Sequence, residues 1–225
     1  MKDKIEETID TYNHIVEEYI DYFNSRDLHG NVQFQKEIDV LVDNLEEGSR
    51  ILDVGTAIGD YPKYLTERCN KDFQVIGIDS SENMIKVAKE KAPKATFEVM
   101  DMRKLRYLEQ SFDAILCLAT LIHVDDATAT KILEKFDTIL RVNGLIIINV
   151  MEHIDGEKEL YDKEPFNPNY NTYFNRYTKD FFINWFKSKN YEILNIFDNP
   201  VFNSEEVKEP SADTNQFSII VQKRN

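Results

Sequence analysis

The first 46 residues show the spacing of two amphipathic helices. Between residues 1 and 25 the apolar and aromatic side chains follow one another at steps of three and four, and they are Ile5, Ile9, Tyr12, Val16, Tyr19, Tyr22 and Phe23. This spacing gathers them on one face and predicts a helix over 1–25. The same spacing predicts a second helix over 33–46, with Phe34, Ile38, Leu41, Val42 and Leu45 on its apolar face.

Between residues 50 and 150, short apolar runs alternate with helical patterns. The runs that we predict as strands are 51–54, 73–78, 95–100, 112–118 and 145–150. Helices are predicted over 60–69, over 80–93 and over 126–141. Asp60 is expected to cap the first of these helices, and Asn143-Gly144 to stop the last. Several runs are apolar throughout, as in strands covered on both faces, so the order predicts a doubly wound α/β sheet with mostly parallel strands.

Residues 152–176 break this alternation with polar and aromatic side chains. A helix is predicted over 178–189, followed by strands over 191–197 and 216–221 with a polar loop at 198–214 between them. Because no helical pattern separates these two strands, we expect an antiparallel C-terminal hairpin with one reversed strand at or near the sheet edge. The result is a seven-stranded sheet, and 225 residues suit a single domain.

The composition narrows the possible partners. The chain has 41 acidic and 27 basic residues, a formal net charge of −14 and 42% hydrophobic residues. Nucleic acids and anionic membranes repel such a chain at long range, so nucleic-acid binding is disfavoured. Cys69 and Cys117 form no CxxC pair or metal-type cluster, so neither a disulfide framework nor a metal site is expected. The charged N-terminus and the lack of a run of about 18 apolar residues predict a cytoplasmic protein without a membrane span.

Candidate chemistry lies where the predicted strands end. In an open α/β sheet, ligands bind beyond the carboxyl ends of the strands, at the topological switch point. The first four strands run into residues 53–59, Asp79, Asp101-Met102 and Leu118-Ala119. We therefore expect these segments to meet at one ligand site.

The turn after the first strand does not suit a dinucleotide. A dinucleotide fingerprint needs small residues at its first, third and sixth places, where a pyrophosphate meets a helix N-terminus. Counted from Gly55, the sixth place is Asp60, whose carboxylate would repel a pyrophosphate. The small residues recur instead at Gly55, Ala57 and Gly59, which lets the backbone approach a zwitterionic group without phosphate. Asp53 is expected to orient this loop or to engage an ammonium group.

The segment Asp53-x-Gly55-x-Ala57-x-Gly59 resembles the first motif, D-x-G-x-G-x-G, of class I S-adenosylmethionine-dependent methyltransferases. Other segments resemble later motifs of this family in the same order, namely 78–85, 112–124 and 140–144. Residues 12–19 are similar to the N-terminal helix of a small-molecule branch, in which that helix closes over the cofactor. Residues 173–178 resemble the segment before its late helix, so the resemblance covers nearly the whole chain.

This resemblance implies a Rossmann-like methyltransferase fold that binds S-adenosylmethionine and releases S-adenosylhomocysteine. It implies that Asp79 binds the ribose and that Asp101 and Met102 lie beside the adenine. The residues expected to bind the cofactor are Tyr12, Tyr19, Asp53, Gly55, Thr56, Ala57, Gly59, Asp79, Ser80, Met84, Asp101, Met102, Leu118 and Ala119.

The same resemblance divides the domain into four segments. Residues 1–48 are expected to form a helical lid and residues 49–151 the cofactor-binding core. Residues 152–176 are expected to form a cap beside the acceptor, and residues 177–225 a C-terminal helix and hairpin.

Fewer residues are candidates for chemistry on the acceptor. His123 lies near the expected methyl donor and is a candidate general base, with a hydrogen-bonded structural role as the alternative. Tyr173, Arg176 and Tyr177 are candidates to face the acceptor, with a place in the core of the cap as the alternative.

Some positions allow a second interpretation or depart from the motifs. Asp79 could instead cap the next helix, and Met84 could simply pack in the core. Ala57 stands in place of the second glycine of the first motif, so its Cβ is expected to narrow the space at the methionine or to demand a negative φ. Asn143 replaces a later glycine and tolerates a left-handed conformation.

We therefore predict an enzyme that transfers a methyl group from S-adenosylmethionine to a small-molecule acceptor by in-line displacement, without a metal. One alternative is an RNA methyltransferase of the same fold, which the net charge of −14 disfavours. Another is a protein that binds S-adenosylmethionine without catalysis, and a nicotinamide-dependent enzyme is more distant. The pattern leaves the acceptor and the oligomeric state open.

Overall fold

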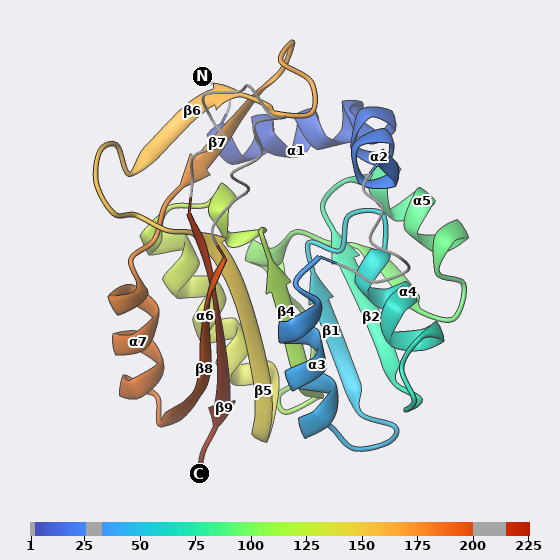
Figure 1. The fold of residues 1–225 in the computed structure, drawn as a ribbon, viewed down its shortest axis with the longest axis vertical. Helices are drawn as coiled ribbons and strands as arrows, with labels where there is room; N and C mark the ends of the chain where they lie inside the picture. Colours follow the sequence, from blue (N-terminus) through green and yellow to red (C-terminus); the bar gives the residue numbers. More distant parts are fainter. Residues whose placement is uncertain (1–2, 26–32, 200–214) are drawn as a thin grey trace.

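The computed structural model describes residues 3–25, 33–199 and 215–225, and its main feature is a seven-stranded sheet (Figure 1). The strand order is β3-β2-β1-β4-β5-β9-β8. The strands are β1 (Arg50–Val54), β2 (Gln74–Asp79), β3 (Thr96–Val99), β4 (Phe112–Leu118), β5 (Leu140–Met151), β8 (Tyr191–Asn199) and β9 (Gln216–Lys223). Strands β1 to β5 are parallel, and β9 runs antiparallel to both β5 and β8. The predicted doubly wound sheet with an antiparallel C-terminal hairpin is confirmed.

Helices cover both faces of this sheet because successive side chains of each strand point to opposite faces. Leu52 of β1 belongs to one buried cluster with the apolar faces of α6 (Asp126–Ile139) and α7 (Lys179–Ser188). Its neighbour Ile51 packs with α3 (Gln35–Asn44) and α4 (Asp60–Glu67) on the other face. Helix α5 (Glu82–Lys91) packs on Phe97 of β3. The strands are therefore buried on both sides, as their continuous apolar runs predict.

A separate layer lies over the carboxyl ends of the parallel strands (Figure 1). It consists of α1 (Lys4–His14), α2 (Val16–Ser25) and the antiparallel pair β6 (Glu159–Lys163) and β7 (Asn171–Asn175). We call these four elements the roof. They come from the segments 1–48 and 152–176 that the sequence predicts as lid and cap, whereas α3, which the predicted lid includes, packs on the sheet instead.

The roof corrects two predictions. The single helix predicted over 1–25 is two helices, because Ile15 leaves the helical conformation at φ −95° and ψ 21° and buries its side chain completely. The segment 152–176 also contains a β-hairpin that the sequence pattern does not indicate. Its strand β6 is almost entirely exposed and β7 is buried after its first residue, so neither strand shows the alternation of a half-buried strand.

Two further predictions, about the start of α4 and the end of α6, are wrong. Gly59, at φ 81°, is the N-cap residue of α4, whereas Asp60 is its first helical residue and pairs with Lys91 at 2.5 Å. Helix α6 ends at Ile139 and β5 begins at once, so Asn143-Gly144 lies within that strand and does not stop the helix. Asn143 has φ 65°, the left-handed conformation expected for it. Most of the loop predicted over 198–214 lies outside the described residues.

Within the three described stretches, no helix is long and apolar enough to cross a membrane. The same stretches contain no group of three or more histidines, cysteines, aspartates and glutamates arranged to hold a metal ion. The cytoplasmic location and the single-domain organisation stay predictions.

Candidate active site

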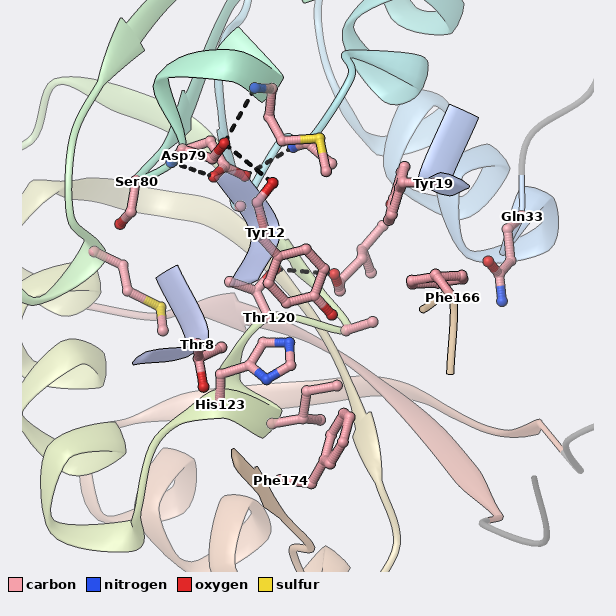
Figure 2. A pocket seen from close by; sticks show the side chains of 18 of the residues that line it. Thr8, Tyr12, Tyr19, Gln33, Asp79, Ser80, Thr120, His123, Phe166 and Phe174 are labelled. Carbon is pink, nitrogen blue, oxygen red and sulfur yellow. Dashed lines mark hydrogen bonds between the residues drawn. The ribbon is translucent and has the colours of Figure 1, made fainter. Parts of the chain in front are cut away.

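A cavity of about 610 Å³ lies between the carboxyl ends of the parallel strands and the roof (Figure 2). The predicted site residues that line it are Tyr12, Tyr19, Gly55, Ala57, Asp79, Ser80, Met84, Asp101, Met102, Leu118, Ala119 and His123. These residues come from α1, α2, α5 and the turns after β1, β2, β3 and β4. The fold thus brings together the segments that the sequence predicts to meet.

The turn after β1 is shaped by close contacts that leave no room for larger side chains. Gly55 has φ 74°, and a Cβ there would lie 2.2 Å from Thr120 Oγ1. Its N–H and that of Thr56 donate to the carbonyl of Ile78 at 2.8 and 2.9 Å. Gly59 lies behind the cavity, where a Cβ would meet Ala88 at 3.1 Å. Gly59 therefore serves the contact between α4 and α5 and does not line the ligand space.

Ala57 corrects the expectation of a negative φ. It adopts φ 45°, in the left-handed region, and its N–H donates to Asp79 Oδ2 at 3.0 Å. A left-handed residue with a Cβ costs roughly 1–2 kcal/mol. The turn thus keeps the shape that a glycine would give and holds its N–H on Asp79.

Asp79 lies in the floor of the cavity with both carboxylate oxygens fixed by backbone donors. Oδ2 accepts from Ala57 N, and Oδ1 accepts from Ser81 N at 2.9 Å (Figure 2). Burial raises the pKa of Asp79, and these backbone hydrogen bonds oppose that shift. Ser81, not Asp79, is the N-cap of α5, accepting from Met84 N at 3.1 Å. The carboxylate also faces the cavity, and a carboxylate of this kind can accept hydrogen bonds from two neighbouring hydroxyl groups of a ligand.

Asp53 and Thr56 lie outside the cavity lining, which corrects their predicted contact with the cofactor. Asp53 is 1% exposed and accepts from Thr56 Oγ1 at 2.6 Å beneath the turn. Burial raises the pKa of Asp53 to about 7. The pair supports the turn from below because the side chain of Asp53 points into the sheet layer, away from the ligand space.

Asp101 and Met102 line the cavity at the end of β3, in the place expected for an adenine. The Asp101 carboxylate accepts from Arg103 N at 2.8 Å and from the Arg103 guanidinium at 2.7 Å. Arg103 also reaches Asp3, just before α1, at 3.2 Å. Arg103 thus links this acid to the roof.

His123 lines the cavity as a neutral imidazole. Its Nδ1 donates to the carbonyl of Tyr173 at 2.9 Å, so in the neutral ring Nε2 carries the lone pair. Burial lowers the pKa of His123 to about 4. Its ring lies edge-on to Tyr12 at 5.2 Å between centroids and packs on Phe174 at 5.4 Å.

The residues predicted to face the acceptor do not line the cavity. Tyr177 is completely buried and its hydroxyl donates to the carbonyl of Val124 at 2.6 Å. Arg176 donates to the carbonyl of Glu157 at 2.9 Å, and Tyr173 offers His123 its backbone only. Phe174 lines the cavity instead. Side chains alternate along β7, so the neighbour of Tyr173 faces the ligand space.

The structure adds residues that the sequence pattern does not single out. Thr120 packs on Gly55, and Phe166 enters from the loop between β6 and β7. Glu37 of α3 and Glu164 after β6 are 2% and 1% exposed, and both line the cavity. No signal marks these acids, because a glutamate on an amphipathic helix or in a polar segment is ordinarily exposed.

Comparison with known proteins agrees with this geometry. Residues 51–144 match the family model described as a methyltransferase domain. The chain is 36% identical over 123 residues to phosphoethanolamine N-methyltransferase 3 of Arabidopsis thaliana, over 53% of this chain and 24% of that protein. It is 31% identical over 127 residues to a carboxy-S-adenosyl-L-methionine synthase of Helicobacter pylori, over 55% of this chain and 52% of that protein. The chain therefore spans about a quarter and about half of the length of these two relatives.

One solved structure is similar over nearly the whole chain. It is the 1,6-didemethyltoxoflavin-N1-methyltransferase of Burkholderia thailandensis, with bound 1,6-didemethyltoxoflavin and S-adenosylhomocysteine. The TM-score is 0.61 at 16% identity, over 96% of this chain and 90% of that chain. At this identity the likeness shows that the two chains share a fold, the Rossmann-like methyltransferase fold.

Proposed function

We propose that this chain is a class I S-adenosylmethionine-dependent methyltransferase, as the match of residues 51–144 to the methyltransferase-domain model and the similarity to a named N-methyltransferase support. The reaction is methyl transfer to a small-molecule acceptor by in-line displacement. Bound S-adenosylmethionine supplies an electrophilic methyl group on a sulfonium sulfur. The chain holds the acceptor in line with that group and excludes water, and positioning of this kind supplies much of the rate.

The observation that carries this proposal is a roofed cavity with Asp79 and Asp101 in its floor. The oxygens of Asp79 suit the two ribose hydroxyls, and Met102 beside Asp101 offers an apolar contact for the adenine. The left-handed turn at Gly55 and Ala57 leaves backbone free to approach the amino-acid part. The residues present therefore fit S-adenosylmethionine.

The roof and the charge favour a small acceptor over RNA. Residues of α1, of α2 and of the β6–β7 hairpin line the cavity, and the chain has a net charge of −14. An RNA substrate needs an open, basic surface to hold its phosphates. The relatives support the same choice, because the Arabidopsis protein is named for phosphoethanolamine and the Burkholderia protein for didemethyltoxoflavin.

His123 has the geometry of a proton acceptor for this reaction. The Tyr173 carbonyl fixes its tautomer, and its lone pair on Nε2 is available at neutral pH because its pKa is near 4. A positioned base typically contributes about 10²–10⁴ in rate. We therefore assign His123 the removal of the proton from an acceptor that reacts through a hydroxyl group.

A second candidate function follows from the Helicobacter relative, which is named as a synthase of a carboxylated S-adenosylmethionine. A chain with that function would form a carboxylated S-adenosylmethionine in the same cavity. Binding of S-adenosylmethionine does not separate the two functions, because both require the same binding site. The reaction product separates them.

Titration calorimetry with S-adenosylmethionine and S-adenosylhomocysteine tests the shared premise. Asp79→Ala is expected to weaken binding at least tenfold, because the buried ribose hydroxyls lose charged acceptors. Asp180→Ala, an exposed acid at the start of α7, is the control and should bind as the wild type does. Unchanged affinity in Asp79→Ala would contradict the ribose assignment, and a wild-type chain that binds neither compound would contradict the proposed function.

Mass spectrometry of a panel of acceptors tests the activity. Formation of S-adenosylhomocysteine together with an acceptor heavier by one methylene unit supports methyl transfer. His123→Asn should bind S-adenosylmethionine normally and methylate acceptors that react through a hydroxyl group at least tenfold more slowly. Binding without turnover on any acceptor would favour the second candidate.

A further inference from the structure

The cavity contains two buried carboxylates that the contacts proposed for S-adenosylmethionine leave unused. Glu37 lies in the first turn of α3, and Glu164 follows β6 in the roof. They approach the same cavity from different elements, and each is at least 98% buried. A buried carboxylate is costly unless a partner compensates its charge.

Glu37 has one carboxylate oxygen without a partner. Oε1 accepts from Asn199 Nδ2 at 2.7 Å and from Ser218 Oγ at 2.9 Å. Oε2 accepts no hydrogen bond from the described residues, and the side chain lines the cavity. Asn199 lines the same wall. The side chain is therefore held at one oxygen and offers the other to a ligand.

Glu164 is held by hydrogen bonds from groups of the roof. Oε2 accepts from Thr172 Oγ1 at 2.7 Å, Oε1 accepts a long hydrogen bond from Phe166 N at 3.5 Å, and the Tyr12 hydroxyl donates to the same carboxylate. Burial raises the pKa of Glu164. Within the described part of the chain, neither Glu164 nor Glu37 forms an ion pair with a lysine or an arginine.

Aromatic rings gather beside these acids. Phe166 lies 5.0 Å from Tyr19 and 4.8 Å from Tyr22, measured between ring centroids, and Tyr19 lies 4.6 Å from Phe23. All four rings line the cavity. The faces of aromatic rings attract cations, and more strongly where water is excluded. Acids and rings together form a surface for an organic cation.

The same cavity is poor in positive charge. Lys36 is the one lysine or arginine among the described lining residues, and it is exposed. His123 is neutral at physiological pH because its pKa is near 4. A phosphate or carboxylate on the acceptor would therefore meet carboxylates without a buried cation to balance it.

We propose that the acceptor is an amine without a phosphate group, bound as its ammonium ion by Glu37 and Glu164 against the rings of Tyr19 and Phe166. This inference rests on the proposed methyl transfer. It separates this chain from its phosphoethanolamine-named relatives, because the substrate in that name carries a phosphate.

The reaction balances with these groups. The bound ammonium gives one proton to the carboxylate of Glu164, which leaves a neutral amine and a carboxylic acid. The nitrogen lone pair then forms the new N–C bond while the methyl C–S bond breaks, and its electron pair stays on sulfur as the thioether. The positive charge moves from sulfur to nitrogen, so the product is an N-methylammonium ion. Glu164 returns its proton to water.

Matched probes test the class of acceptor. Methyl transfer and binding to the chain saturated with S-adenosylhomocysteine are measured for phenethylamine, 2-phenylethanol, ethanolamine and phosphoethanolamine. Each amine is expected to bind or react at least tenfold better than its alcohol or phosphorylated counterpart. The inference is wrong if phosphoethanolamine is preferred to ethanolamine, if 2-phenylethanol matches phenethylamine, or if neither amine binds.

Charge-neutral variants test the two acids. Glu37→Gln keeps an oxygen for Asn199 and Ser218, so it should fold and should raise the KM for the amine at least tenfold. Glu164→Gln should do the same and also lower kcat. Glu46→Gln, an exposed glutamate just after α3, should change neither value.

The outcomes separate this inference from the function on which it rests. Both variants should bind S-adenosylmethionine as the wild type does, because neither acid belongs to the proposed cofactor contacts. An unchanged KM in folded Glu37→Gln and Glu164→Gln overturns the amine site and leaves methyl transfer standing. A wild-type chain that binds no S-adenosylmethionine overturns both.

Discussion

Backbone atoms hold the floor of the cavity, whereas side chains hold much of its roof. In the floor, Gly55 and Thr56 donate to the Ile78 carbonyl, and Ala57 donates to Asp79, 22 residues away. In the roof, Thr11 Oγ1 donates to the Asn171 carbonyl across 160 residues, and Thr8 Oγ1 accepts from Tyr173 N across 165. The floor is thus part of the hydrogen-bonded sheet, while in the roof individual side-chain hydrogen bonds join segments that are distant in the sequence. We expect the floor to keep its shape when the roof opens.

The buried acid in the floor gives the largest expected effect. Burial raises the pKa of Asp53 to about 7, so between pH 4 and 7 the unfolded chain loses a proton that the folded chain keeps. The contribution of Asp53 to the free energy of unfolding should therefore be highest below pH 4. It should fall as the pH rises from 4 to 7 and stay at the lower value above pH 7. Asp53→Asn keeps an acceptor for Thr56 and should be more stable than the wild type by about 2–4 kcal/mol at pH 8.

Urea unfolding at pH 4.5, 6 and 8 checks this prediction. The advantage of Asp53→Asn should be small at pH 4.5 and grow with pH. An equal difference at all three values would mean that Asp53 does not titrate in the folded chain. That result would contradict the view that the folded floor keeps Asp53 buried and protonated at neutral pH.

The side-chain contacts of the roof give the next effect. Thr8→Val combined with Thr11→Val removes two hydrogen bonds between α1 and β7, each worth about 1 kcal/mol, with almost no change of shape. Hydrogen exchange of the α1 amides should accelerate on the order of tenfold, while the amides of β1 and β2 keep their protection. Thr130→Val, whose hydroxyl donates only within α6, is the control and should leave α1 unchanged. Equal acceleration in floor and roof would contradict the comparison.

The left-handed turn gives the smallest effect. Ala57→Gly removes the strain of an alanine at φ 45°, but the glycine gives the unfolded chain more conformational entropy. Because the strain is the larger of the two effects, the variant should be more stable by about 0.5–1 kcal/mol. Ala88→Gly, at a buried position inside α5, should destabilise it by about 1 kcal/mol or more. Both values come from urea unfolding. A loss of stability in Ala57→Gly would mean that the Cβ makes a contact worth more than the strain.

The sequence by itself determined the sheet, its order of elements and the meeting of Asp79, Asp101 and the Gly55–Ala57 turn at one edge. These features follow from short-range patterns, because an apolar run defines a strand and parallel strands place their carboxyl ends together. The acids in the floor are next to those strand ends, so their place follows from the strands themselves.

Only the tertiary structure decided which side chains complete the cavity. Phe174 faces the ligand space and Tyr173 does not, because the register of β7 against α1 sets which face of that strand is turned inward. Glu37 is buried because Asn199 and Ser218 arrive from distant parts of the chain, and Glu164 is buried where the hairpin of β6 and β7 folds back and brings Thr172 to it. The Asp53 carboxylate is bonded by Thr56, three residues away, and this contact forms only when the turn folds. The sequence pattern predicts the helices of the roof, but contacts between distant segments decide which side chains the roof and α3 turn toward the cavity.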